Sequence, residues 1–110
     1  MTQTESDAIA ARLGPPVPID RAEYEAWLRV KRPRAVVGYR CGACGCPVAR
    51  WLAARTGAEW LVHYYSLTRD GEIIGPPPAW LRRHILDVDR SGRPDTGITA
   101  RKALALLEAQ

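Results

Sequence analysis

The chain has 110 residues, of which 46% are hydrophobic and 25% are charged, and its formal net charge is +4 at pH 7. This length suits one domain with a real core and is too short for two. No apolar run reaches the roughly 18 residues that a membrane span needs. The N-terminus also lacks the apolar core of a signal peptide, so we expect a cytoplasmic protein that does not enter a membrane.

The first 18 residues are polar and then rich in glycine and proline. They predict a flexible N-terminal arm, with some helix at Asp7–Leu13, ahead of a single domain at 19–110. A D-x-x-E capping box that begins at Asp20, followed by an apolar stripe at helical spacing, predicts an amphipathic helix over 21–31. Arg32-Pro33 ends this helix, because the residue before a proline is pushed out of helical geometry.

The middle of the chain predicts a strand, a helix and a second strand. Ala35–Tyr39 forms the first strand, in which Gly38 indicates a bulge or a close backbone approach. The helix starts at Pro47, a residue type favoured at the first helical position. Glu59–Leu67 is apolar on both faces, which is typical of a strand that is covered on both sides.

The C-terminal half continues with a hairpin and two helices. A D-G turn leads into the hairpin arm Glu72–Ile74, and helices are expected at Ala79–Val88 and Ala100–Ala109 around the polar loop Asp89–Gly97. The predicted order is therefore α-β-α-β-β-α-α. This order indicates a small α+β domain with about three mostly antiparallel strands and four helices packed on them.

All three cysteines lie in one loop, as the C-x2-C-x-C cluster of Cys41, Cys44 and Cys46. In a cytoplasmic chain such a cluster favours metal or redox chemistry over a disulfide. Zinc takes four tetrahedral ligands, so these thiols with His63 or His84 would form a zinc site. No second C-x2-C or C-x-x-H pair follows, and free cysteine also serves as a small buried filler. We therefore expect no cofactor, with a zinc-stabilised module as the alternative.

A second alternative is a thiol redox protein. A strand, the letters C-G-A-C and a helix resemble thioredoxin-like proteins, although the resemblance covers this loop only and the preceding βαβ unit is missing. The dipole at a helix N-terminus favours a thiolate, so Cys46, directly before Pro47, would be the more reactive cysteine. Cys44 or Cys41 would then be its redox partner.

Lys31 and Lys102 are the only lysines, so arginine supplies 14 of the 16 cationic side chains. The planar arginine fork suits carboxylates, phosphates and base edges. No Ser-His-Asp order, P-loop or G-x-G-x-x-G motif occurs, so we expect a non-catalytic protein that binds a protein partner or a nucleic acid, as a monomer or a homodimer. The predicted binding surface comprises Arg29, Lys31, Arg32, Arg34, Arg50, Arg82 and Arg83.

Overall fold

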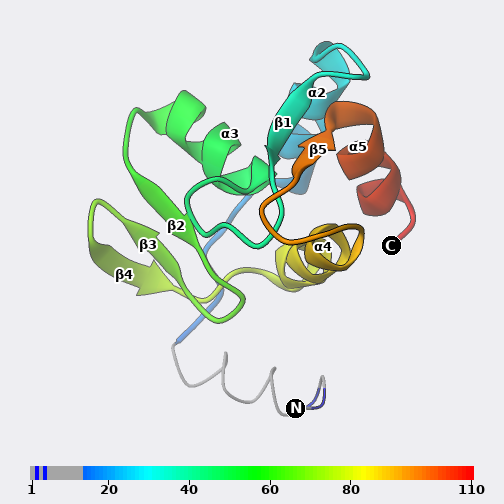
Figure 1. The fold of residues 1–110 in the computed structure, drawn as a ribbon. Coiled ribbons are helices and arrows are strands. Elements are labelled where there is room, and N and C mark those ends of the chain that lie inside the picture. The colour runs from blue at the N-terminus through cyan, green and yellow to red at the C-terminus, as the bar shows by residue number, and fades with distance from the viewer. Residues whose placement is uncertain (1, 3, 5–13) are drawn as a thin grey trace.

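The structure is a computed structural model that describes residues 2, 4 and 14–110 (Figure 1). Its four helices in this described part are α2 (Arg21–Val30), α3 (Pro47–Thr56), α4 (Ala79–Arg90) and α5 (Ala100–Glu108). The strands are β1 (Val36–Tyr39), β2 (Trp60–Val62), β3 (Leu67–Arg69), β4 (Glu72–Gly75) and β5 (Gly97–Thr99). The α+β class and the order of the predicted elements are confirmed. The helix expected at Asp7–Leu13 lies outside the described residues.

Side-chain caps set the starts of the two helices that later form the candidate site. α2 begins after Asp20, whose carboxylate accepts the backbone N–H groups of Ala22 at 2.8 Å and Glu23 at 3.2 Å. α5 begins after Thr99, whose hydroxyl accepts the N–H of Lys102 at 3.2 Å. Both starts were predicted, because capping residues act locally and their pattern is visible in the sequence.

The strands form two separate antiparallel sheets. β2, β3 and β4 make a three-stranded sheet, in which β3 and β4 meet at Asp70-Gly71 with positive φ at both residues. The one sheet that was expected is therefore two, because β1 does not join these strands. β1 and β5 make a second sheet that the sequence analysis did not predict. The predicted polar loop reaches only the first residue of β5, Gly97, and Ile98 at the centre of this strand is 1% exposed and anchors it to the core.

The single strand expected over Glu59–Leu67 was wrong, because this segment holds β2, a turn and only the first residue of β3. In the turn, the backbone N–H of His63 donates to the carbonyl of Ser66 at 3.0 Å. Tyr64 and Tyr65 occupy the same turn, where their rings pack edge to face with centroids 5.1 Å apart. These two tyrosines extended the apolar pattern through the turn and concealed it, since no Gly, Pro, Asn or Asp marks it.

Both sheets and all four helices surround one core, at whose centre lies the ring of Tyr24. Four rings, those of Trp27, Trp51, Trp80 and His84, lie with their centroids 5.2 to 6.2 Å from it. The Tyr24 hydroxyl and His84 Nε2 share a hydrogen bond of 2.8 Å. Within the described residues, no helix has both the length and the apolar character to cross a membrane.

The last residues of the predicted arm run along the three-stranded sheet. The backbone N–H of Val17 donates to the carbonyl of Pro76 at 2.9 Å, and the Val17 side chain packs against the core. Val17 is therefore attached to the domain that was expected to start at residue 19. The flexibility of the arm and its boundary stay predictions.

Candidate functional site

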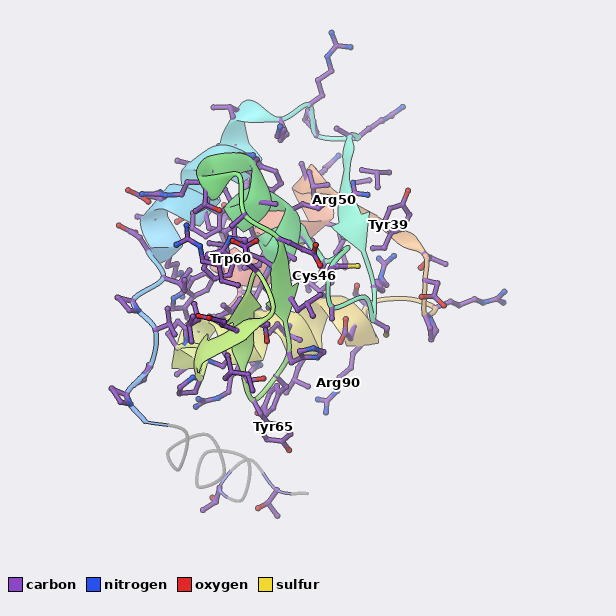
Figure 2. The ribbon with its side chains drawn as sticks, turned by 90° about the vertical axis from the view of Figure 1, so that its left-hand side faces the viewer. Tyr39, Cys46, Arg50, Trp60, Tyr65 and Arg90 are labelled. Atoms are coloured by element: carbon purple, nitrogen blue, oxygen red, sulfur yellow. The ribbon has the colours of Figure 1, made fainter. Side chains whose placement is uncertain are left out.

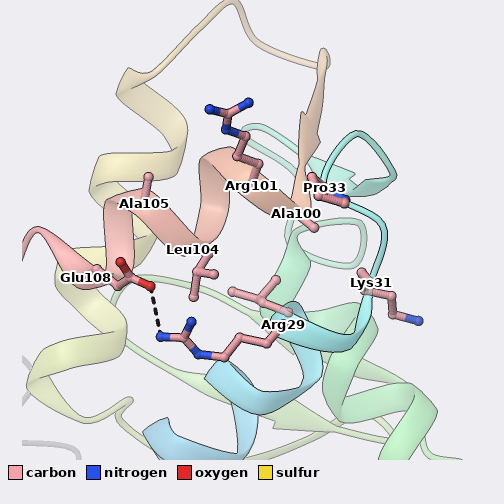
Figure 3. A pocket seen from close by; sticks show the side chains of 9 residues that line it. Arg29, Lys31, Pro33, Ala100, Arg101, Leu104, Ala105 and Glu108 are labelled. Atoms are coloured by element: carbon pink, nitrogen blue, oxygen red, sulfur yellow. Dashed lines mark hydrogen bonds and ion pairs between the residues drawn. The ribbon is translucent and has the colours of Figure 1, made fainter.

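A groove of about 470 Å³ lies between α2 and α5, next to the turn that follows α2 (Figure 3). Its aliphatic lining residues are Leu28, Pro33, Ala100, Leu104 and Ala105. Its charged lining residues are Arg29, Lys31, Arg101 and Glu108. The groove thus combines an apolar floor with a rim that is mainly cationic.

Main-chain hydrogen bonds hold one end of this groove. The backbone N–H of Ala100 donates to the carbonyl of Ala35 at 2.9 Å, and that of Arg101 donates to the carbonyl of Pro33 at 3.0 Å. These two N–H groups belong to the first turn of α5, and the N–H groups of a first turn find no carbonyl acceptor within their own helix. The turn after α2 therefore joins the start of α5 through backbone bonds that surface substitutions leave in place.

The cations of the groove differ in their partners. Arg29 donates to Glu25 on its own helix and to Glu108 on α5, each at 2.9 Å. The hydrogen bond to Glu25 is the main reason why the pKa of Arg29 is raised. Lys31 and Arg101 form no ion pair with any described carboxylate, and Figure 3 shows both extending outward near the turn. Lys31 and Arg101 are thus the charges that an incoming acidic group would meet.

Part of the predicted arginine surface joins this end of the groove. Arg29 and Lys31 line the groove itself, and Arg32 and Arg34 lie exposed in the turn directly after them. Arg101, which the predicted set left out, completes the cluster from α5. The sequence shows Arg101 near the start of a helix, but it does not show that this helix lies against α2.

The other predicted arginines lie elsewhere. Arg50 is on α3, where its guanidinium carbon lies 4.9 Å from the centre of the Tyr39 ring (Figure 2). Arg82 and Arg83 are on α4, and Arg83 pairs with Asp87 one helical turn later. The predicted set therefore does not form one continuous surface, because its members sit on three helices and one turn.

The cysteine loop connects β1 to α3, and its last cysteine is part of the core. Cys46 is the N-cap of α3, and its Sγ accepts the backbone N–H of Ala49 at 3.4 Å. Burial raises the pKa of the Cys46 thiol to about 11, although hydrogen bonds from Ala49 and Val48 act in the opposite direction. The prediction that the helix N-terminus favours the Cys46 thiolate is thus wrong. Burial raises the pKa of this thiol by more than the hydrogen bonds at the helix start lower it.

The remaining candidate ligands surround a second cavity only in part. Cys41, Cys46 and His63 line it, whereas Cys44 is exposed and is not among its lining residues. In the portion of the chain that the structure describes, no three His, Cys, Asp or Glu side chains are arranged to hold a metal ion. The zinc site and the redox pair stay predictions.

Comparison with known proteins adds no assignment. No family model, curated protein or solved structure matches this chain. The α2–α5 groove, in which Lys31 and Arg101 have no carboxylate partner among the described residues, is therefore the basis for a functional proposal.

The burial of Cys46 predicts unequal thiol reactivity. At about pH 8, we expect iodoacetamide to modify the exposed Cys41 and Cys44 at least about tenfold faster than Cys46, because a thiol must ionise to react. Peptide mass spectrometry over time measures the three rates, and the unfolded chain in urea is the control in which all three react. Labelling of folded Cys46 as fast as Cys44 would contradict this account.

Proposed function

We propose that this protein binds an acidic, amphipathic segment of a partner protein in the α2–α5 groove, without catalysing a reaction. The observation that carries the proposal is the aliphatic floor beside two cations that lack a described carboxylate partner. An amphipathic helix places its apolar face in such a groove. Carboxylates on its polar face would then accept hydrogen bonds from Lys31 and Arg101.

The groove floor favours a protein partner over a nucleic acid. Single-stranded bases stack on aromatic rings, and none of the described lining residues is aromatic. Leu104, half-buried, and Ala105, exposed, instead offer aliphatic surface that suits leucine-like side chains. At the other end of the groove Glu108 is paired with Arg29, so the described lining cations without a carboxylate partner lie only near Lys31 and Arg101. The charge pattern therefore suits a few carboxylates near one end of the groove.

A fluorescence anisotropy titration tests the proposal. The probe is a labelled helical peptide of about 16 residues with leucines at i, i+3, i+4 and i+7 and glutamates on its other face. We expect Leu104→Asp, and separately Lys31→Glu combined with Arg101→Glu, to weaken binding by about tenfold or more. Arg90→Glu is the matched control, because Arg90 is exposed at the end of α4 and does not line the groove.

Two results would contradict the proposal. The first is equal peptide affinity for the wild-type protein, both groove variants and the control. The second is tighter binding of a single-stranded oligonucleotide that displaces the peptide and is lost in the Lys31→Glu and Arg101→Glu variant. The second result would assign the groove to nucleic acid instead.

A further inference from the structure

The turn that follows α2 continues the α2–α5 groove beyond its lining residues. The backbone N–H of Ala35 donates to the carbonyl of Arg32 at 2.9 Å, which closes a β-turn with Pro33 at the second position, where proline is favoured. Pro33 lines the groove (Figure 3). Its two neighbours in the turn, Arg32 and Arg34, are exposed. These two arginines therefore flank a residue of the groove wall.

Hydrogen bonds on both sides of Arg34 fix the backbone of this turn. The carbonyls of Pro33 and Ala35 accept the N–H groups of Arg101 and Ala100, so each neighbour of Arg34 is bonded to α5. A surface that is already fixed loses less conformational entropy when a partner binds. The turn is therefore a preorganised extension of the groove.

No described acidic side chain offsets the charge of this turn. Arg32 and Arg34 form no ion pair or side-chain hydrogen bond with any described residue. The carboxylates on the two helices of the groove are already paired with arginines of α2 and α3, as Glu23–Arg55, Glu25–Arg29 and Glu108–Arg29. The turn thus presents two free guanidinium groups to an approaching anion.

The start of α5 adds positive charge at the same place. The N-terminus of a helix carries a partial positive charge, which acidic residues in the first turn usually offset. The first turn of α5 contains no acidic residue and carries the cation Arg101 instead. Its position is therefore unfavourable for α5 alone and becomes favourable when an anion binds beside it.

We propose that the segment bound in the α2–α5 groove continues past the groove as a short acidic run, which lies on Arg32 and Arg34. This inference rests on the function proposed above and adds a feature of the partner. Because Pro33 joins the turn to the groove, one continuous segment can reach both. Carboxylates of the run accept hydrogen bonds from the two guanidinium groups. Exposed ion pairs are individually weak, so the run adds modestly to the affinity of a segment that the groove already holds.

Fluorescence anisotropy with three labelled peptides tests this inference. The first is the groove peptide described above, and the other two carry about three additional glutamates, at the N-terminal end of one and the C-terminal end of the other. The two placements cover both directions in which a helix can lie in the groove. We expect one extended peptide to bind about fivefold more tightly than the groove peptide, and to lose this gain in the Arg32→Gln, Arg34→Gln double variant. The affinity of the groove peptide should change by less than about twofold in this variant.

The double variant Arg90→Gln, Arg93→Gln is the matched control, because it removes the same charge from two exposed arginines that do not line the groove. We expect this control to keep the gain. The inference alone is overturned if the groove peptide binds and neither extension improves its affinity, or if the gain survives the loss of Arg32 and Arg34. It is also overturned if the control loses the gain to the same extent. Absence of binding by all three peptides would overturn the proposed function, and this inference with it.

Discussion

Replacing Gly38 by alanine should destabilise the protein by about 3 kcal/mol, because an added methyl group has no room. Gly38 lies in β1, where a Cβ would be 2.5 Å from the backbone nitrogen of Pro47 and 2.8 Å from the carbonyl carbon of Cys46. These are backbone atoms of the cysteine loop and of the first residue of α3. They cannot rotate away as the end of a long side chain could. The free energy of unfolding, measured in urea, checks this expectation.

Gly42→Ala is the matched control within the same loop. A Cβ at Gly42 would meet its nearest neighbour, the backbone nitrogen of Gly45, at an ordinary contact distance of 3.7 Å. We expect this substitution to change stability by less than about 1 kcal/mol. Equal effects of the two substitutions would show that the close approach of β1 to the cysteine loop does not matter for stability.

Stability should fall as the pH drops from about 6.5 to about 4, by up to about 3 kcal/mol from His84 alone. Burial lowers the pKa of His84 from 6.5 to about 4 in the folded protein, while smaller influences of Asp87 and Arg21 oppose each other. In this pH window the unfolded chain therefore binds the proton more strongly. The stability that the protein has with His84 neutral is fully present above pH 6.5. It is lost as the pH falls toward and through the folded pKa of about 4.

Urea unfolding at a series of pH values measures this effect. Carboxylates titrate in the same region, so the informative quantity is the difference in slope between the wild-type protein and His84→Phe. We expect the variant to have lower stability overall and a shallower pH dependence. His63→Gln, at the exposed histidine, keeps His84 and should keep the wild-type slope. If the free energy of unfolding changes with pH in the same way in the wild-type protein and in His84→Phe, His84 is not the source of this pH dependence.

Local signals in the sequence predicted most of the fold. Asp20 and Thr99 cap their helices through their own side chains, and Asp70-Gly71 turns its hairpin through positive φ. The close approach at Gly38 was also anticipated from a glycine within a strand. In each of these cases, neighbours along the chain decide the structure, and no knowledge of the tertiary fold is needed.

The missed features depend on contacts between distant segments. β5 is three residues long, too short to show a period, and it exists because it pairs with β1. The groove depends on α5 lying beside α2, which brings Arg101 to the same end as Lys31. The raised pKa of Cys46 depends on burial, which the sequence pattern at a helix start does not reveal. These features follow from packing and not from local preference.

The most direct test of the central claim is an NMR titration of the ¹⁵N-labelled protein with the acidic amphipathic peptide. If the peptide occupies the α2–α5 groove, the backbone amide signals of Lys31, Arg101, Leu104 and Ala105 will shift together and saturate. Signals from the cysteine loop and α4 will stay in place. Saturable shifts confined to those other elements, or no shifts at all with the peptide in excess, would contradict the account.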